Sequence, residues 1–420
     1  MAVNFGVGEE EAVMIDERSG PVRRFLGIAA LALGTALIGI MLTVVIPILP
    51  NIAAESAHGA GGRFPIQLLI AMPMLGLVLG GLLSTILFAH VSARTVFLGA
   101  LLLFAAVGAF GAVADMRMLI VSRLVIGIIC ACLGAASTAL IGERVARERR
   151  ARVLGVQTAA SSILAIVAML VSGRVADAAG WRSSFLIFPA IAIVVFLVAL
   201  FCSSPSPVRP KVTTMLPKAG NWLAVLKLWP IYLFVVVVNV TAFTTSSQAS
   251  FVLADEGITS SVGRAQVMSL NQIMIVFAAI SFPFVRSWAG SRFMPALILL
   301  VMGAGLVMLG ANSGLTSAAL ALAVLGIGNG WLFPYQSSLL LQRASSEVRG
   351  QAAGLMVSSQ FLADAINPIM LAPIIAAIGL KNTIGSIGVL ALVGCACAVL
   401  FGVRHAREPE PVGEERLSHG

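Results

Sequence analysis

The sequence predicts an all-α membrane protein, with twelve transmembrane helices in two pseudo-symmetric six-helix bundles. Three observations support this prediction. The 420 residues are 59% hydrophobic and only 11% charged, whereas soluble domains have about 25% charged residues. Twelve apolar runs are each long enough to cross a bilayer, which takes about 20 helical residues. Features of the first half also recur in the second half at a nearly constant spacing.

The apolar runs follow one another with short polar connections. We expect spans at roughly residues 25–50, 66–89, 95–115, 117–142, 153–177, 183–203, 228–253, 264–286, 293–312, 317–341, 351–378 and 383–403. The polar, acidic start of the chain differs from a secretory signal, and the first apolar run is longer than a signal core. We therefore interpret that run as a membrane span.

Basic residues set the expected orientation. With the N-terminus in the cytoplasm, twenty Lys and Arg residues fall in inner segments and six, including Arg264, fall in outer segments. This asymmetry follows the positive-inside rule and predicts that both termini are cytoplasmic. Because the positive charges recur between apolar runs and form no single patch, the formal charge of +9 does not indicate nucleic-acid binding.

The longest inner connection divides the chain into halves. It is rich in Pro, Ser and Lys and discourages regular structure, apart from a possible short interfacial helix near Trp222. We predict a cytoplasmic tail at 1–24, a six-helix bundle at 25–203, a cytoplasmic linker at 204–227, a second bundle at 228–403 and a cytoplasmic tail at 404–420.

An internal repeat relates the two halves. An offset of 199 residues pairs Gly127 with Gly326 and Gly155 with Gly354, and it also pairs the arginines of the corresponding inner loops. Two parallel six-span repeats are one of the designs used by secondary transporters. The sequence therefore favours duplication of a six-helix unit.

The chain resembles the major facilitator superfamily (MFS) over nearly its whole length. RLVIGIICACLGAAS carries the R-x-x-x-G signature of span four at Arg123 and Gly127. GERVARERRARVLG, SSEVRGQAAGL and GWRSSFLIFP resemble the loop after span four, the loop after span ten and the start of span six. The general pattern is similar to bacterial drug:proton antiporters. The resemblance implies the MFS fold, a monomer in the bacterial inner membrane, and spans one, four, seven and ten lining the cavity.

Two motifs depart from the family pattern. In the loop after span two, Ala89 stands where the family has a gating Asp, and Ser92 stands where it has Gly. In span five, Ala168-Met169 and Ser172-Gly173 replace the Gly-Pro and Gly-Gly pairs of the antiport signature. Gating must therefore rest partly on other residues, and the signal for drug export is weaker than a full match would give.

Asp364 lies in the middle of an apolar run, within FLADAINPI. A charged side chain at the bilayer centre costs about 2.5–3.5 kcal/mol on insertion scales, and intramembrane acids are by default functional. Gln360, Asp364 and Asn367 share one helical face at spacings of four and three. A carboxyl in such surroundings favours its neutral form and could exchange a proton near neutral pH. The alternative is a carboxyl that stays protonated and bonds between helices.

Arg123 is the second candidate for proton coupling, as the family resemblance suggests. Gly127, Cys130 and Gly134 continue its helical face, and these small residues leave room beside the guanidinium or let another helix approach. The alternative is that Arg123 reaches the outer interface along its aliphatic stem.

Polar and aromatic stripes mark the expected substrate cavity. Such stripes usually point away from lipid, although bonding between helices would also explain them. The candidate substrate contacts are Asn239, Phe243, Ser246, Asn271, Gln272, Asn329, Trp331, Phe333, Tyr335, Gln336, Gln360 and Asn367. A cavity with few charges and several aromatic rings suits an amphiphilic organic molecule better than an inorganic ion. The candidates for contacts at the inner gate are Arg94, Arg144, Arg150, Arg292, Arg343 and Arg349.

The sequence contains no P-loop, no His/Cys metal spacing and no hydrolase constellation. We therefore expect no enzyme, no metal and no cofactor. The leading hypothesis is a proton-coupled transporter that exports a small organic molecule by alternating access. Proton-coupled uptake of an organic acid or nutrient stays open, as does a non-transporting membrane sensor or assembly protein on the same fold.

Overall fold

The computed structural model describes residues 21–57, 64–145, 147–202, 222–311, 314–345 and 348–407. Within these ranges the chain is helical and contains no strand. Twelve helices or helix segments are long and apolar enough to span a membrane, and each overlaps one predicted run. The prediction of an all-α protein with twelve spans is therefore confirmed. Most of the predicted tails and linker lie outside the described residues.

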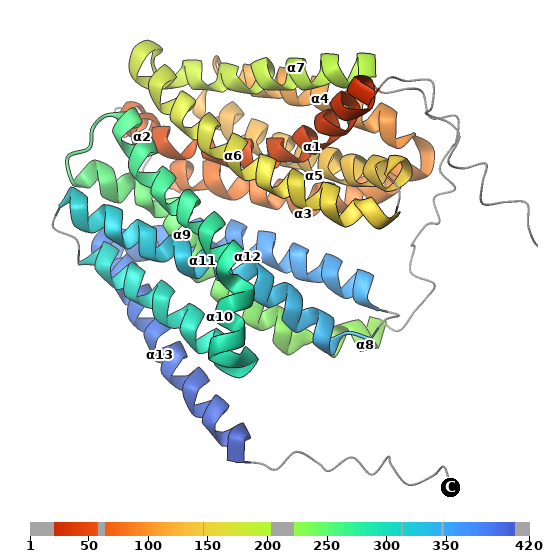
Figure 1. Ribbon diagram of the computed structural model, residues 1–420. Helices are drawn as coiled ribbons and strands as arrows, with labels where there is room; N and C mark the ends of the chain where they lie inside the picture. Colours follow the sequence, from red (N-terminus) through yellow and green to blue (C-terminus); the bar gives the residue numbers. More distant parts are fainter. Residues whose placement is uncertain are drawn as a thin grey trace, which may run out of the picture. The chain divides into compact units, whose positions relative to one another are not determined.

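The chain divides into two compact units. Unit 1 comprises Met1–Gly220 with the short segment Ser260–Ala265, and unit 2 comprises Asn221–Thr259 with Gln266–Gly420. Figure 1 colours the helices of unit 1 from red to yellow-green and those of unit 2 from green to blue. The elements of unit 1 are α1 (Pro21–Thr43), η1 (Ile46–Ile48), α2 (Leu49–Ala57), α3 (Phe64–His90), α4 (Ala93–Phe110), α5 (Met116–Arg144), α6 (Arg147–Ala179), η2 (Trp181–Leu186) and α7 (Ile187–Cys202).

Unit 2 begins with a short helix at the position expected near Trp222. Its elements are α8 (Trp222–Leu226), α9 (Trp229–Asp255), α10 (Ser261–Gly310), α11 (Leu315–Arg343), α12 (Arg349–Ile378) and α13 (Leu380–Arg407). Gly290, with a φ of 74°, interrupts α10 and separates its two membrane spans, Ser261–Gly290 and Arg292–Gly310. A positive φ of this size favours glycine, which has no Cβ to clash.

Glycines let one pair of helices in each unit pack with their backbones close together. In unit 1, a Cβ added to Gly127 of α5 would lie 2.2 Å from the Pro73 carbonyl oxygen of α3. In unit 2, a Cβ added to Gly326 of α11 would lie 2.5 Å from the Asn271 carbonyl oxygen of α10. Small residues commonly permit such approach in membrane helices. The two glycines are the pair related by the offset of 199, so the repeat in the sequence corresponds to equivalent packing in the two units.

A second pair of glycines supports the same duplication. Gly180 lies between α6 and η2 with a φ of 83°, and Gly379 lies between α12 and α13 with a φ of 84°. These residues are also 199 positions apart, and each sits at the turn between the fifth and sixth span of its unit. The same backbone conformation at both turns supports the pseudo-symmetry of the two bundles.

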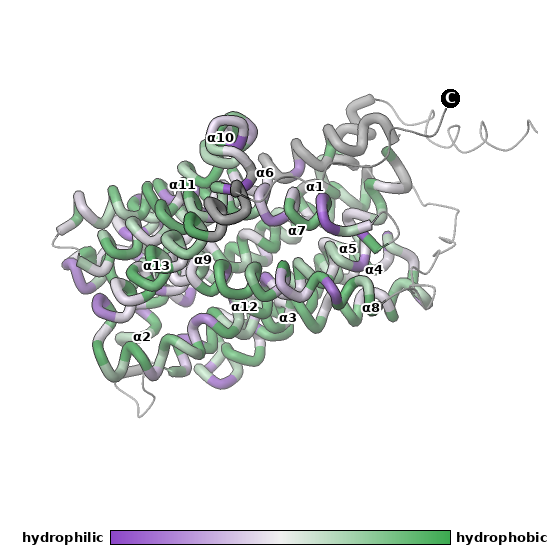
Figure 2. The backbone as a smooth tube through the Cα atoms, turned by 90° about the horizontal axis from the view of Figure 1, so that it is seen from below, coloured by the Kyte–Doolittle hydropathy of each residue, from purple (hydrophilic) through white to green (hydrophobic). Residues whose placement is uncertain are grey.

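Large apolar side chains lie on the outside of the helices. Trp288, Phe284 and Leu390 are among the most exposed, and Trp288 is 81% exposed. Figure 2 shows hydrophobic residues along most of the length of the helices. A soluble monomer rarely exposes so much contiguous apolar surface, so this exterior fits contact with lipid.

Candidate functional site

A pocket of about 220 Å³ lies within unit 2, between α9, α11 and α12. Its lining combines carboxamides, a hydroxyl, aromatic rings and one carboxyl group. The lining residues are Asn239, Ala242, Phe243, Ser246, Asn329, Leu332, Phe333, Gln336, Gln360, Phe361 and Asp364. Seven of the substrate candidates from the sequence therefore share one pocket with Asp364.

Helical spacing explains why these side chains meet. Residues three and four apart lie on the same side of a helix. On α9 this places Asn239, Phe243 and Ser246 together, and α11 and α12 present their own polar residues at the same intervals. The helical faces inferred from the sequence therefore indicated several of the residues that line the pocket together.

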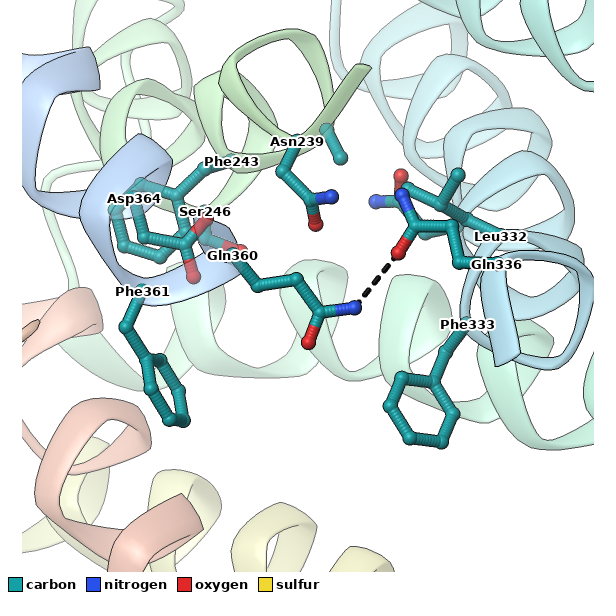
Figure 3. A pocket seen from close by; sticks show the side chains of 11 residues that line it. Asn239, Phe243, Ser246, Leu332, Phe333, Gln336, Gln360, Phe361 and Asp364 are labelled. Atoms are coloured by element: carbon teal, nitrogen blue, oxygen red, sulfur yellow. Dashed lines mark hydrogen bonds between the residues drawn. The ribbon is translucent and has the colours of Figure 1, made fainter. Parts of the chain in front are cut away.

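Two carboxamides form a bridge between α11 and α12. The Gln360 side-chain nitrogen donates a hydrogen bond of 2.7 Å to the side-chain oxygen of Gln336. In Figure 3 the Gln360 side chain extends across the pocket to reach Gln336. Gln336 is fully buried, yet its nitrogen has no hydrogen-bond partner within the described part of the chain. The side-chain oxygen of Asn329 is also buried without a partner there.

Asp364 is the carboxyl group of the pocket. It is partly buried, and the pocket lining contains no Lys, Arg or His. Figure 3 shows its carboxyl group beside Phe243 and Ser246. Among the described residues, Asp364 makes neither an ion pair nor a hydrogen bond. A carboxyl group without a compensating charge is better accommodated in its neutral form, because burial penalises the charged form.

Asn367 does not point into this pocket, although it shares a face with Gln360 in the sequence. Its side-chain nitrogen donates to the Val240 carbonyl oxygen at 2.6 Å and to the Thr244 hydroxyl at 2.8 Å. Its side-chain oxygen accepts a hydrogen bond of 2.8 Å from the Ser247 hydroxyl. All three partners belong to α9, so Asn367 connects α12 to α9.

Four further candidates also lie outside the pocket lining. Asn271 donates to the Leu322 carbonyl oxygen at 2.8 Å and joins α10 to α11. Trp331 donates to the Ser281 hydroxyl at 3.2 Å, and Tyr335 is buried in a hydrophobic cluster with Met302 and its neighbours. Gln272 lies on α10 beside Asn271, partly buried. Asn271 and Trp331 thus form hydrogen bonds between helices, which was the alternative to substrate contact in the sequence analysis.

The sequence analysis did not single out Phe361, Ala242 or Leu332, which also line the pocket. Phe361 is three residues before Asp364 and therefore on a neighbouring part of the same face. That spacing could have identified it. Ala242 and Leu332 gave no signal, because they are ordinary apolar residues in apolar helices.

Arg123 lies in unit 1, surrounded by aromatic rings. Arg123 is 1% exposed, and its guanidinium carbon lies 5.0 Å from the centre of the Phe185 ring and 5.1 Å from that of Phe188. Its three side-chain nitrogens have no hydrogen-bond partner among the described residues. A cation over an aromatic face is attracted by the ring quadrupole. Arg123 therefore does not reach the outer interface, and Gly127 on its face serves the packing of α5 on α3.

The structure describes some of the arginines predicted to lie in inner loops. Arg349 donates to the Ala344 carbonyl oxygen at 3.1 Å, within its own loop, and Arg292 and Arg343 are exposed. Nothing is described of the side chains of Arg144 and Arg150. The departure at Ser92 has a local role, because Ser92 caps α4 by accepting a hydrogen bond of 3.2 Å from the Thr95 backbone. Arg94 has a buried nitrogen without a partner in the described residues.

Arg264 was assigned to an outer loop from the sequence, but α10 already begins at Ser261 and the Arg264 side chain is 1% exposed. Within unit 1, its guanidinium donates to the Pro47 carbonyl oxygen at 2.8 Å and to the side chain of Asn51. Asp177 of α6 accepts hydrogen bonds from the backbone of Ser261 at 2.8 Å and Val262 at 3.0 Å. This polar cluster lies within unit 1, which includes the first turn of α10, and no local sequence pattern indicated it.

Comparison with known proteins identifies the family. The family model described as Major Facilitator Superfamily matches residues 31–368, which is most of the chain. The chain therefore belongs to the Major Facilitator Superfamily, a family of membrane transporters and not of enzymes.

Individual relatives are distant. Two uncharacterized MFS-type transporters, one from each of two strains of Mycobacterium tuberculosis, are 29% identical over 192 residues, which is 45% of this chain and 27% of each relative. The chain thus matches about a quarter of the length of these curated relatives.

Solved structures show the same fold. The structure of a bacterial homologue of the human lysosomal transporter Spinster, in an inward-facing and unoccupied conformation, has a TM-score of 0.73 at 17% identity and covers 92% of this chain and 98% of its own. A mutant of the nucleoside transporter NupG has a TM-score of 0.68 at 13% identity and covers 88% of this chain and 99% of its own.

Proposed function

We propose that this protein is a proton-coupled secondary transporter that exports a small organic molecule, with Asp364 carrying the proton and the pocket of unit 2 binding the substrate. The observation that carries the proposal is the position of Asp364, which lines the same pocket as seven predicted substrate contacts. A proton and a substrate that share one pocket can influence each other directly.

The surroundings of Asp364 favour proton exchange. No basic side chain lines the pocket, so no fixed positive charge holds the carboxyl group in its ionised form. Ionisable residues inside the membrane are rare and mark proton or substrate pathways. When Asp364 loses its proton, the pocket gains a negative charge next to Phe243 and Ser246, and its affinity for a bound molecule changes.

The lining suits an organic molecule. Ligand sites for organic molecules combine apolar and aromatic walls with a few polar groups that fix orientation. Here Phe243, Phe333 and Phe361 supply rings, and four carboxamides supply hydrogen bonds. The volume of about 220 Å³ is below the roughly 300–1,000 Å³ of sites for drug-sized ligands. Unit 2 by itself therefore has room for a small molecule or for one part of a larger one.

Coupling follows from alternating access, in which the duplicated halves of a secondary transporter rearrange around a site near the middle of the membrane. We expect the pocket to bind substrate with different affinity when Asp364 is protonated and when it is deprotonated, which links substrate binding to proton binding. Each ligand shifts the conformational equilibrium by its difference in affinity for the two conformations. The excess of basic residues in alternate loops supports cytoplasmic termini, and we place the protein in a bacterial inner membrane.

The test uses inside-out membrane vesicles from cells that produce the full chain. Respiration acidifies the vesicle interior, and a fluorescent dye reports the pH gradient. Neutral, cationic and anionic aromatic compounds are then added one at a time. For an exporter, we expect at least one compound to dissipate the gradient in vesicles with the protein but not in empty vesicles.

Asp364→Asn keeps the shape of the side chain and removes its titration. We expect this variant to lose the proton movement, whereas Asp255→Asn, the same change at an exposed residue near the end of α9, should behave as the unaltered protein does. Full proton-driven transport by Asp364→Asn would refute the role of Asp364. Accumulation of the compound only in right-side-out vesicles under an inward proton gradient would make uptake the direction of transport.

A further inference from the structure

We propose that the pocket of unit 2 selects neutral, planar heterocycles that carry a lactam edge, meaning a ring N–H next to a ring carbonyl. This inference rests on the proposed function, because it takes the pocket as the substrate site. It goes further by stating which chemical class the carboxamides recognise.

Two side chains of α11 each have one buried polar atom without a hydrogen-bond partner in the described part of the chain. Gln336 is 0% exposed, and its side-chain nitrogen has no hydrogen-bond partner among the described residues. The side-chain oxygen of Asn329 is likewise buried and unpartnered there. The two residues are seven positions apart, or about two turns, and both line the pocket. A buried polar group without a partner is costly, so these groups favour a ligand that satisfies them.

The two amides require a donor and an acceptor from the same ligand. A carboxamide carries one acceptor oxygen and two N–H donors. Gln360 already donates to the side-chain oxygen of Gln336, and the side-chain nitrogen of Gln336 can donate to an acceptor on the ligand. The side-chain oxygen of Asn329 can accept from a donor on the ligand.

The aromatic residues favour a flat ligand. Phe243, Phe333 and Phe361 come from three different helices, and Figure 3 shows the rings of Phe333 and Phe361 on opposite sides of the Gln336–Gln360 bridge. Phe333 is 60% exposed, so its ring has area available for contact. Aromatic rings prefer offset or edge-to-face contacts with other rings, which a planar heterocycle provides.

Other ligand classes fit less well. The anionic group of an organic acid supplies only acceptors and would meet Asp364 with no basic residue in the lining. A quaternary ammonium ion supplies neither donor nor acceptor and would leave both amides unpaired. A lactam supplies both a donor and an acceptor, and it stays neutral in either protonation state of Asp364.

The probe for this inference is 2-quinolinone, a planar bicyclic lactam. Its binding to the purified full-length protein in detergent is measured at fixed pH with radiolabelled compound. Two methylated analogues compete with it: N-methyl-2-quinolinone lacks the N–H donor, and 4-methyl-2-quinolinone has the same added bulk but keeps the donor. We expect the N-methyl compound to compete at least tenfold more weakly than the 4-methyl compound. Sites built to hydrogen-bond a group discriminate strongly against analogues that lack it.

Variants connect the discrimination to the pocket. Gln336→Met keeps the length of the side chain without its polar atoms, and Asn329→Leu does the same at the second position. We expect either change to reduce the preference for the N–H compound to less than threefold. Gln342→Met alters an exposed glutamine near the end of the same helix and should keep the full preference.

The outcomes separate this inference from the proposed function. Equal competition by the two methylated compounds, or tight binding of a tetraalkylammonium ion in place of the lactam, would overturn the lactam class even if one variant failed to fold. Lactam selectivity that remains while Asp364→Asn transports normally would instead refute proton coupling at Asp364 and leave the ligand class standing.

Discussion

Gly127 offers a sharp test of how the helices pack in unit 1. A Cβ at this position would lie 2.2 Å from the Pro73 carbonyl oxygen and 2.9 Å from two other backbone atoms of Pro73. Ordinary contacts of a Cβ begin at 3.4 Å. Because the obstacle is backbone and cannot rotate away, Gly127→Ala requires α3 and α5 to move apart by about 1.2 Å.

The magnitude follows from this separation. Overpacking a well-packed interior typically costs about 1–3 kcal/mol. For units of about 150–250 residues, each kcal/mol corresponds to roughly 2–4 °C in the melting temperature. We therefore expect Gly127→Ala to lower the melting temperature of the detergent-purified protein by about 2–12 °C.

The assay compares three alanine variants by thermal unfolding followed with size-exclusion chromatography. Gly326→Ala, at the equivalent position of unit 2, would place its Cβ 2.5 Å from the Asn271 carbonyl oxygen and should also destabilise the protein. Gly99→Ala is the control, because a Cβ there meets nothing within 4 Å, and better helix propensity should leave stability unchanged or raise it by up to about 1 kcal/mol. If Gly127→Ala melted with the control, the close approach of α3 and α5 would be wrong.

Three further predictions concern polar residues. Asn367→Leu removes three hydrogen bonds between α12 and α9. Such bonds contribute about 0.6 kcal/mol each in membrane proteins, so we expect the free energy of unfolding to fall by about 2 kcal/mol. An unchanged melting temperature would contradict this role. Asp177→Ala removes the acceptor at the first turn of α10 and should cost about 0.5–2 kcal/mol, as loss of a helix cap does; a proteolysis rate at this turn equal to that of the unaltered protein would argue against it. Arg123→Met fills similar space without charge, and we expect lost proton-driven transport with retained stability; normal transport in the vesicle assay would show that the guanidinium only packs against its aromatic neighbours.

Much of the fold could be predicted from the sequence because the membrane restricts the possible structures. Within hydrocarbon, every backbone polar group must be paired within the protein. An α-helix pairs these groups inside its own segment, so long apolar runs of about 20 residues favour helices. All twelve predicted spans overlap a span in the structure. The offset of 199 also had physical content, since it relates the packing glycines Gly127 and Gly326 and the turn glycines Gly180 and Gly379.

The contents of the pocket could be predicted only in part. Helical periodicity placed Gln360, Asp364 and Asn367 on one face, but Asn367 bonds to α9 whereas the other two line the pocket. Periodicity gives the direction of a side chain relative to its own helix. It does not predict at which position along the helix a neighbouring helix packs against that face and leaves no cavity. That position depends on how the helices cross.

Arg264 shows the same limit over a longer separation in the chain. From the sequence it was one more positive charge at the edge of an apolar run, yet it is buried by contacts with Pro47 and Asn51, more than 200 residues earlier. The sequence by itself determined the class of protein, the number of spans and the duplication, because hydropathy and helical spacing act locally along the chain. Only the tertiary structure decided which polar side chains bind one another and which line the pocket of unit 2, because that choice depends on groups brought together from distant segments.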